Sequence, residues 1–344
     1  LWIHVFQEAL FLIFFTAHYP KLLVLEVGAD RPGDLKQILR IATPNAVVVT
    51  RLPDVPVHVE AYASAEAVRE EEFTPAYSLA KDAPLIISAD DENAKRLARQ
   101  LSVRLATFGC AKDADVRMKD IRVKKDGSRP VGMEVTVEVE GSHHTLATVG
   151  ALGKSQVYAP SAGLALARML DVSLTDALKG LASYVPPPGR ARILKGKNDS
   201  ILIDDSYNSS PAAVEAILES LSEIPAKRRV VILGDMLELG RYSVSEHEQV
   251  GRLASHKADV VVAVGSRARA LAESAQKEGK GEVLSFADSH AAREGLVDFP
   301  RSGDLILIKG SQSIRLERVV EALLQDSADV SKLVRQDVEW LNKK

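Results

Sequence analysis

Cysteine is almost absent from this chain. Its 344 residues include one, Cys110, so an internal disulfide is excluded, and no Cys or His stands near it at metal-binding spacing. The sequence therefore predicts a reducing, cytoplasmic setting. An excess of positive charge is missing as well, because the formal net charge is −3. This balance argues against a surface built to bind nucleic acid or an anionic membrane.

An unbroken apolar run long enough to span a membrane is also lacking. Residues 1–20 are strongly apolar, but His4, Gln7 and Glu8 interrupt them, and a spanning helix needs roughly 20 apolar residues. A basic leading region and a small-residue cleavage site, which would mark a signal peptide, are not found. We expect a buried helix here that leads into a strand over 22–26. Because the first residue is Leu1, we also expect either a removed upstream segment or a fragment.

A phosphate-binding loop is the third absence. Gly153-Lys154-Ser155 resembles the end of such a loop, but the motif needs an earlier glycine where this chain has Thr148. The segment also closes a region of antiparallel character instead of following a buried parallel strand. No other Gly-Lys-Ser or Gly-Lys-Thr occurs. We therefore do not expect Lys154 to bind phosphate.

The first half of the chain combines two kinds of pattern. Short apolar runs bounded by Gly, Pro or Asp predict buried parallel strands over 22–27, 46–50 and 83–88, with a helix from Asp34. Residues 115–150 instead alternate apolar and polar side chains, which predicts antiparallel hairpins. Helices are expected at about 160–170 and 173–183.

The second half is regular. Five strand–helix units in succession predict a parallel sheet with helices on both faces, which makes the fold class α/β and doubly wound. The strands are expected over 200–204, 229–233, 259–264, 282–286 and 304–308, and the helices over 211–222, 246–256, 266–277, 289–297 and 313–324. The Pro-rich stretch 186–189 marks the expected domain boundary. An apolar stripe in the tail, formed by Val330, Leu333, Val334, Val338 and Leu341, indicates core packing.

Polar residues gather where these strands end. Asp204 and Asp205 begin a turn that continues through Ser206, Tyr207 and Asn208, while Asp235 and Lys309 follow two other strands. Ligands of such sheets bind beyond the carboxyl ends of the strands. Acids and one lysine at this edge suit a polar, phosphate-bearing ligand. The alternative is a set of ordinary turns and helix caps, which we favour for Gly265-Ser266.

Three sequence blocks carry a family resemblance. PGRARILKGKNDSILIDDSYNSSP (188–211), LGDMLELG (233–240) and IKGSQSIRLE (308–317), with His247 between them, resemble the C-terminal domain of the Mur ligases. Upstream, LEVGADRPGDL (25–35), PVHVEAYAS (56–64) and ISADDENAKRLA (87–98) resemble segments of the central domain of that family. The resemblance implies a partial central ATPase-type domain over 1–185, a Rossmann-like ligase domain over 186–326 and a helical tail over 327–344.

The resemblance also implies an activity. It is strongest to the Mur ligases that join D-alanyl-D-alanine to a UDP-N-acetylmuramoyl tripeptide in peptidoglycan synthesis, using ATP and Mg²⁺ and passing through an acyl phosphate. By the family pattern, Glu26 and His58 would hold Mg²⁺, and Lys309 would join them in catalysis. Taken alone, Glu26 is equally a charge at a strand end and His58 a surface residue.

The remaining site residues follow from the same pattern. Gln156 would contact adenine, and Arg190 and Asp205 would lie near adenine and ribose. Tyr207, Asn208 and Asp235 would lie towards the incoming dipeptide. Arg190 is alternatively a surface cap, and Asp235 a helix N-cap.

The chain departs from the family in three places. The phosphate loop and an N-terminal domain, expected upstream of Leu1, are absent; Ser155-Gln156 replaces a His-Asn pair; and Glu70, Glu71 and Glu72 stand where a commonly carbamylated lysine is expected. A glutamate there could supply a similar oxygen ligand. Two other interpretations stay open: a non-catalytic relative that binds nucleotide or muropeptide, and a folylpolyglutamate- or cyanophycin-type amide ligase.

Overall fold

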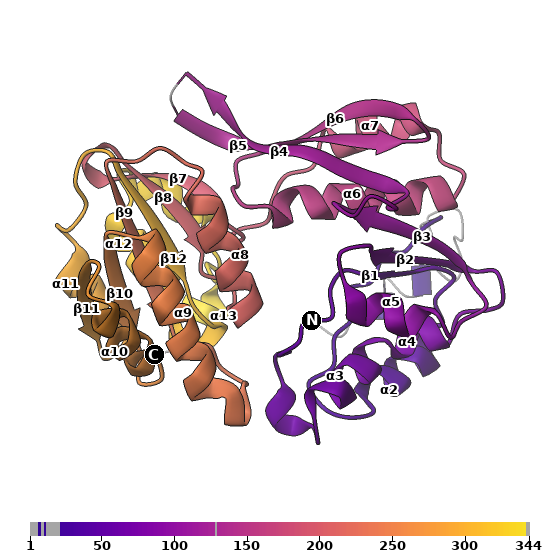
Figure 1. Cartoon of the computed structure of the whole chain (residues 1–344), viewed down its shortest axis with the longest axis horizontal. Helices are drawn as coiled ribbons and strands as arrows, with labels where there is room; N and C mark the ends of the chain where they lie inside the picture. Colours follow the sequence, from indigo (N-terminus) through magenta and orange to yellow (C-terminus); the bar gives the residue numbers. More distant parts are fainter. Residues whose placement is uncertain (1–5, 8–9, 12–20, 128, 342–344) are drawn as a thin grey trace.

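The computed structural model describes residues 6–7, 10–11, 21–127 and 129–341, and within them the chain forms two six-stranded sheets, one in each half (Figure 1). Both sheets mix parallel and antiparallel strands and carry helices, which confirms the predicted α/β class. Among the described residues, no helix has the length and apolar character needed to cross a membrane.

The first sheet has its strands in sequence order, β1 to β6. Strands β1 to β4 are parallel, and β4 to β6 are antiparallel, as the alternating pattern over 115–150 predicted. The strand over 104–109 was not expected. The strands are β1 (Val47–Val49), β2 (Pro84–Ser88), β3 (Arg104–Gly109), β4 (Val116–Asp126), β5 (Arg129–Val139) and β6 (Ser142–Val149). The helices before and between them are α2 (Asp34–Ile41), η2 (Val59–Ala61), α3 (Ala65–Glu72), α4 (Thr74–Tyr77) and α5 (Glu92–Ala98).

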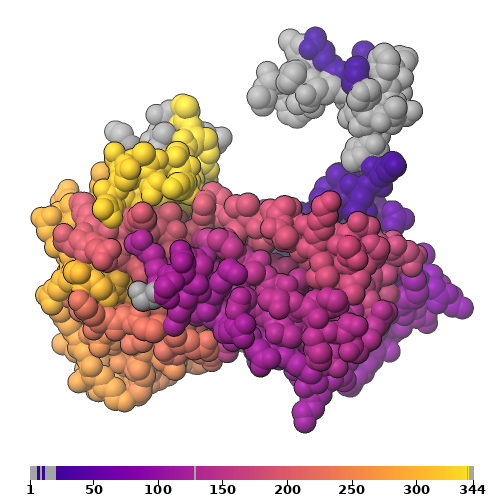
Figure 2. Space-filling view, turned by 90° about the horizontal axis from the view of Figure 1, so that it is seen from above, coloured from indigo at the N-terminus to yellow at the C-terminus, as the bar shows by residue number. Residues whose placement is uncertain are grey.

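The strand expected over 22–27 is not formed, and that prediction is wrong. These residues form no regular secondary structure and no strand pairing, and their apolar side chains are exposed, Val24 at 77%. Figure 2 shows this indigo end of the described chain standing away from the main body. A run of apolar residues becomes a buried strand only where a neighbouring strand accepts its hydrogen bonds. Most of residues 1–20 lie outside the described part, and Phe6, Leu10 and Phe11 are exposed instead of buried.

Helix α6 (Ser155–Met169) begins about five residues before the expected helix. It therefore contains a proline, Pro160, in its interior. Proline has no amide hydrogen to bond the carbonyl four residues earlier. That carbonyl belongs to Gln156, and the hydroxyl of Thr148 donates to it at 2.7 Å. A side chain from β6 therefore replaces the missing helix bond. Helix α7 (Leu174–Leu181) follows.

The second sheet has the order β11-β10-β9-β12-β8-β7, in which β7 alone runs antiparallel. The five predicted parallel strands are present, whereas β7 was missed. The strands are β7 (Arg192–Gly196), β8 (Ser200–Asp205), β9 (Arg228–Gly234), β10 (Val260–Val264), β11 (Glu282–Phe286) and β12 (Asp304–Lys309). The helices and helical turns are η3 (Lys197–Asp199), α8 (Pro211–Leu221), η4 (Gly240–Tyr242), α9 (Ser243–Lys257), α10 (Ala268–Glu278), α11 (Ser289–Leu296), η5 (Gln312–Ile314) and α12 (Glu317–Leu323).

Alternate residues of these strands enter two separate cores. Val231 and Leu233 of β9 pack with the helices α8, α9 and α10, whereas Val230 and Ile232 pack with α11 and α12. Successive side chains of a strand point to opposite faces, so a strand buried on both sides is apolar throughout. The doubly wound arrangement is therefore observed. The carboxyl ends of β8, β9 and β12 lie side by side at one edge.

The described part of the tail, up to residue 341, is helical only in short pieces. It forms the short helical turns η6 (Ser327–Lys332) and α13 (Val338–Leu341). Leu333 and Val334 are buried between them, but Val338 is exposed, so the stripe is only partly core. The stretch 186–189 lies between α7 and β7, that is, between the two sheets; the domain limits drawn from it stay a prediction.

Candidate active site at the strand ends

Lys309 joins the end of β12 to the turn that follows β8. Its ammonium lies 2.8 Å from Oδ2 of Asp205 and donates to the carbonyl of Asn208, also at 2.8 Å. The lysine side chain is 4% exposed. A buried ammonium is stable only when charged or polar partners replace its water. The convergence of Asp205, Asn208 and Lys309 on one edge is therefore what the strand-end argument expected.

The same carboxylate reaches the segment between the two sheets. Oδ1 of Asp205 accepts a hydrogen bond from the amide of Ala191 at 3.0 Å. The side chain of Gln156, at the start of α6, donates to the carbonyl of Arg190 at 3.1 Å. Two main-chain bonds, Leu152 to Ala191 and Ile193 to Gly150, each of 2.9 Å, complete the connection. The three residues predicted to bind the nucleotide, Gln156, Arg190 and Asp205, thus lie along one chain of contacts.

Arg190 also contacts a residue predicted to face the dipeptide. Its guanidinium lies 4.1 Å from the ring centroid of Tyr207, a cation–π contact. Close backbone approach makes this possible, because the amide of Tyr207 bonds to the carbonyl of Gly189. Gly189 has a positive φ of 65°, and a Cβ there would lie 3.0 Å from the Tyr207 nitrogen. Glycine is therefore required at this position.

Asp235 has the contacts of a helix cap. Its Oδ1 accepts from the amide of Ala268, the first residue of α10, at 2.7 Å. A Cβ on Gly265 would lie 2.4 Å from that oxygen, so the glycine makes room for the carboxylate. This geometry matches the alternative that the sequence left open, although the capped helix is the one after β10. A role for Asp235 with substrate stays a prediction.

His247 holds the loop after β9. It is buried, Nε2 accepts from the amide of Met236 at 3.0 Å, and Nδ1 lies 2.6 Å from the carbonyl of Ser243. The carbonyl requires the proton on Nδ1, so the imidazole is neutral in this arrangement. Burial lowers the pKa of His247 below its ordinary value. The histidine is thus a support for the loop and contributes no fixed charge.

Asp204 lies beneath the same turn. Its Oδ1 accepts from the amide and hydroxyl of Ser206, while no described residue bonds to its Oδ2. Burial raises the pKa of Asp204 to about 6, with smaller contributions from Asp205 and Glu317. A carboxyl group in such surroundings keeps a proton more readily than an exposed one.

His58 lies where the two halves of the chain meet. Its Nδ1 is 2.9 Å from Oε2 of Glu238 in the loop after β9, and its Nε2 is 3.6 Å from Oδ1 of Asp30. The residue has a left-handed backbone, with φ at 63°. Glu26 stands on the exposed segment before α2. Both ring nitrogens of His58 therefore already face carboxylates.

Comparison with known proteins identifies the architecture. A model of the Mur ligase middle domain matches residues 9–167, and a model of the Mur ligase glutamate ligase domain matches residues 189–312. The chain belongs to the Mur ligase family. The matched segments follow each other in the order of the two sheets, so each half of this Mur ligase corresponds to one family domain.

Two curated relatives are UDP-N-acetylmuramoyl-tripeptide–D-alanyl-D-alanine ligases. The protein from Bacillus subtilis is 26% identical over 89% of this chain, and that from Escherichia coli is 29% identical over 88%. The Mur ligase chain spans 65% of the length of each. Among solved structures, MurF ligase from Thermotoga maritima in complex with ADP is 25% identical and has a TM-score of 0.77. The match covers 92% of this chain and 69% of the Thermotoga chain. MurF from Acinetobacter baumannii, 23% identical with a TM-score of 0.74 over 89% of this chain and 64% of its own, shares the fold.

The described part of this Mur ligase contains no group of three or more His, Cys, Asp or Glu side chains placed to hold a metal. Mg²⁺ prefers an octahedral set of oxygens, whereas His58 offers ring nitrogens that face Glu238 and Asp30. The assignment of Glu26 and His58 to the metal stays a prediction.

The three glutamates at the end of α3 have separate partners. Glu70 accepts from the hydroxyl of Tyr77 at 2.5 Å, and Glu71 accepts from the amide of Leu35 at 3.1 Å. Burial raises the pKa of Glu72, and the charges of His58 and Arg69 partly offset this effect.

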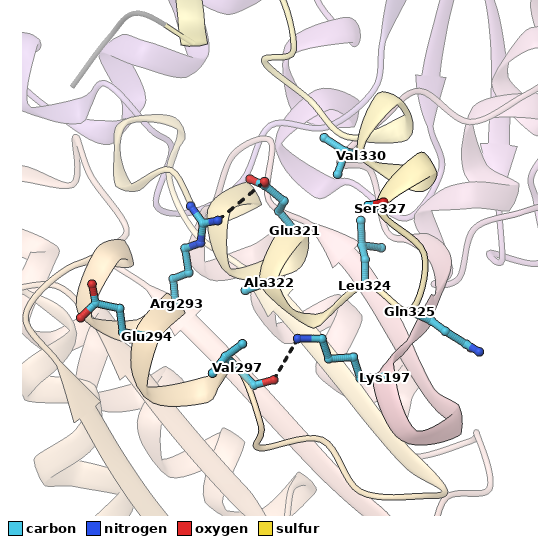
Figure 3. A pocket seen from close by; sticks show the side chains of 10 residues that line it. All are labelled: Lys197, Arg293, Glu294, Val297, Glu321, Ala322, Leu324, Gln325, Ser327 and Val330. Atoms are coloured by element: carbon cyan, nitrogen blue, oxygen red, sulfur yellow. Dashed lines mark hydrogen bonds and ion pairs between the residues drawn. The ribbon is translucent and has the colours of Figure 1, made fainter.

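One hollow of this Mur ligase, of about 680 Å³, lies away from the site. Lys197, Val297 and Leu324 line it, at the edge where β8 and β12 begin (Figure 3). Lys197 donates to the carbonyl of Val297, and Arg293 pairs with Glu321. These charged side chains therefore already have partners within the hollow. We assign it no role in the site.

Two residues at the site were missed by the sequence analysis. Glu238 lies inside the quoted block 233–240 but was given no role, although its contact with His58 joins the halves. Arg335 lies outside every quoted block and contacts the turn at Tyr207. An isolated arginine beside the apolar stripe of the tail carries no pattern that would single it out.

Proposed function

We propose that this chain is the central and C-terminal part of an ATP-dependent ligase that joins D-alanyl-D-alanine to a UDP-N-acetylmuramoyl tripeptide in peptidoglycan synthesis. The supporting observation is the bridge made by Lys309, which brings the turn Asp205–Asn208 to the end of β12. The curated relatives carry this activity in their names. The domain limits 1–185, 186–326 and 327–344, and a cytoplasmic location, belong to the same proposal.

The proposed reaction has two steps. An oxygen of the tripeptide carboxylate attacks the γ-phosphorus of ATP, and ADP leaves, which gives an acyl phosphate. The amine of the dipeptide then donates its electron pair to the acyl carbon; phosphate leaves with the bonding pair and the amine loses a proton. Most of the catalysis in such phosphoryl transfers comes from positioning and from electrostatic stabilisation.

The residues of this chain supply binding and orientation. Gln156, Arg190 and Asp205, which form one chain of contacts, would hold adenosine. The Thermotoga MurF ligase, which shares the fold, was solved in complex with ADP. Tyr207 and Asn208 would face the dipeptide. Lys309 fixes the turn that carries them and adds a positive charge to the edge. Mg²⁺ belongs to the proposal as the partner of ATP, without a role derived for Glu26 or His58.

The test is release of ADP by the purified chain in the presence of ATP, the UDP-muramoyl tripeptide and D-alanyl-D-alanine. The proposal predicts release that requires both acceptor and dipeptide and that Lys309→Met reduces at least tenfold. Lys332→Met, which removes an exposed lysine of the tail, is the matched control. Release with glutamate but not with the dipeptide would favour a folylpolyglutamate-type ligase instead.

A second candidate is a non-catalytic protein that binds nucleotide or muropeptide. The observation that favours it is the triplet Glu70, Glu71 and Glu72, which stands where the family resemblance places a commonly carbamylated lysine. It predicts binding of ADP in a calorimetric titration without ADP release in the first assay. Failure to release ADP, together with failure to bind either ADP or the UDP-muramoyl tripeptide, would contradict both candidates.

A further inference from the structure

The tail of the chain packs on the turn that follows β8. Leu333 and Val334 are buried, and a Cβ on Gly189 would lie 2.7 Å from Cγ1 of Val334. Figure 2 shows the yellow tail lying over the second half of the molecule. The family segment that matches this half ends at residue 312. The contacts of the tail are therefore a feature of this chain that the family match does not describe.

Arg335 is the tail residue that reaches furthest into the turn. Its side chain is 3% exposed. One terminal nitrogen donates to the carbonyl of Ser206 at 3.2 Å, and the other donates to the carbonyl of Tyr207 at 2.6 Å. The planar guanidinium presents several donors in a fixed arrangement, which lets one side chain bind two neighbouring carbonyls.

Arg335 is itself held by a charged partner. Its guanidinium bonds to Oε2 of Glu317 at 2.8 Å, and Arg315 bonds to the other oxygen of the same carboxylate. The ring of Trp340 lies 5.6 Å from the guanidinium of Arg335 and 5.3 Å from that of Arg315. Removal of one member of such a buried network leaves the charge of its partner buried without compensation.

Together with Lys309, this arginine occupies three consecutive carbonyls of the turn. Arg335 binds those of Ser206 and Tyr207, and Lys309 binds that of Asn208. The ring of Tyr207 is also within cation–π distance of two guanidinium groups, 4.1 Å from Arg190 and 5.9 Å from Arg335. A turn fixed in this way at successive peptide groups presents its side chains without a further ordering cost.

We propose that Arg335 is a positioning residue for the turn Ser206–Asn208, and that through it the tail sets the affinity for the dipeptide. This inference rests on the proposed function, which places Tyr207 and Asn208 next to the dipeptide. Loss of the guanidinium leaves two carbonyls and the Glu317 carboxylate without this donor, so the turn relaxes. The contacts of Gln156 and Asp205 with the segment 190–191 do not involve the tail.

The test compares Arg335→Ala, Arg335→Lys and the control Lys332→Ala, whose ammonium pairs within the tail with Asp329. Hydrogen exchange of the peptide that covers 204–212 reports on the turn, because the amides of Ser206 and Tyr207 are hydrogen-bonded. Calorimetric titration with D-alanyl-D-alanine and with ADP reports on the two ligands separately. Thermal unfolding shows whether each variant is folded.

We expect Arg335→Ala to speed exchange in that peptide at least tenfold and to weaken dipeptide binding about tenfold. The loss for ADP should be smaller, because the turn reaches the nucleotide side only through the contact of Tyr207 with Arg190 and the link of Lys309 to Asp205. Arg335→Lys should recover thermal stability but only part of the dipeptide affinity, since one ammonium cannot replace a fork of donors. Lys332→Ala should match the wild type in all readouts.

Unchanged exchange at 204–212, or faster exchange spread evenly over the second sheet, would overturn the inference. Faster local exchange with unaltered dipeptide affinity would overturn the link to the ligand. Failure of the wild-type chain to bind the dipeptide at all would instead count against the proposed function, while the exchange of the turn would still decide whether Arg335 holds it.

Discussion

Nδ1 of His58 lies 2.9 Å from Oε2 of Glu238, and this contact joins the two halves of the chain at a distance from the segment that connects them in sequence. The backbones also approach closely there, because a Cβ on Gly240 would lie 3.2 Å from Cα of Glu60. The loop after β9 therefore contacts both the strand-end site and the first half.

Glu238→Ala should loosen this contact without unfolding the chain. Both side chains are partly exposed, His58 at 26% and Glu238 at 46%, and exposed ion pairs contribute about 0–1 kcal/mol. We expect a small change in the free energy of unfolding but a larger radius of gyration in X-ray scattering. Glu223→Ala, which removes an exposed glutamate of the same half, is the control. Equal radii for both variants would contradict the prediction.

Asp204 should make the protein less stable as the pH rises from about 4 to 6. Its carboxyl has an ordinary pKa of 3.8, and burial raises the pKa to about 6 in the folded chain. Between these values the folded chain keeps the proton that the unfolded chain releases, so the free energy of unfolding falls with rising pH. The full loss is roughly 3 kcal/mol.

Asp204→Asn should remove this pH-dependent part of the stability. Urea unfolding at pH 4 and pH 6.5 should therefore show a smaller difference in the free energy of unfolding for the variant than for the wild type. Asp298→Asn, at an exposed position, is the control. An equal pH dependence in the wild type and Asp204→Asn would show that the carboxyl is ionised in the folded protein without cost.

His247 should act in the opposite direction. Burial lowers its pKa from the ordinary 6.5 in the folded chain, so below that pH the unfolded chain binds the proton more readily. The free energy of unfolding then falls as the pH falls. His247→Gln should therefore lose less stability than the wild type between pH 7 and 5.5 in urea unfolding. His256→Gln, on the exposed end of the same helix, should keep the wild-type dependence, and a match between the two variants would refute the assignment.

Thr148→Val should destabilise the chain by about 1–3 kcal/mol, because it leaves the carbonyl of Gln156 buried without a donor. Pro160 cannot supply the missing helix bond. Thr148→Ser keeps the hydroxyl and should cost less. Chemical unfolding of the two variants measures the difference. Equal stability would mean that another donor reaches the carbonyl.

The sequence predicted the elements whose own pattern decides their structure. The strands of the second sheet are apolar on both faces because helices cover both, so their runs were recognisable, and the convergence of Asp205 and Lys309 followed from parallel strand ends. The segment 22–27 has the same kind of run but no neighbouring strand, a condition that its own residues do not encode. Strand β7 was missed because it lies at a sheet edge directly after the Pro-rich stretch.

The candidate site was predictable only in part, for similar reasons. The blocks around Asp204, Asp235 and Lys309 contain several polar residues at strand ends, and this pattern makes them recognisable as a candidate site. The contact of Asp235 with α10 and the reach of Arg335 into the turn depend on distant segments that the chain brings together. Long-range contacts of single side chains leave no local periodicity from which they could be predicted.

Asp205 has a carboxylate whose two oxygens are both engaged, Oδ1 by the amide of Ala191 and Oδ2 by the ammonium of Lys309. Each carboxylate oxygen can accept a second hydrogen bond, so a hydroxyl group bound here would share its oxygen with the bond that fixes the segment between the sheets or with the bond that fixes the turn. Binding of a ligand to this carboxylate is accordingly coupled to the position of the segment around Ala191. A ligand hydroxyl bound to the Asp205 carboxylate would therefore affect both the segment between the sheets and the turn after β8, because both are bonded to this one group.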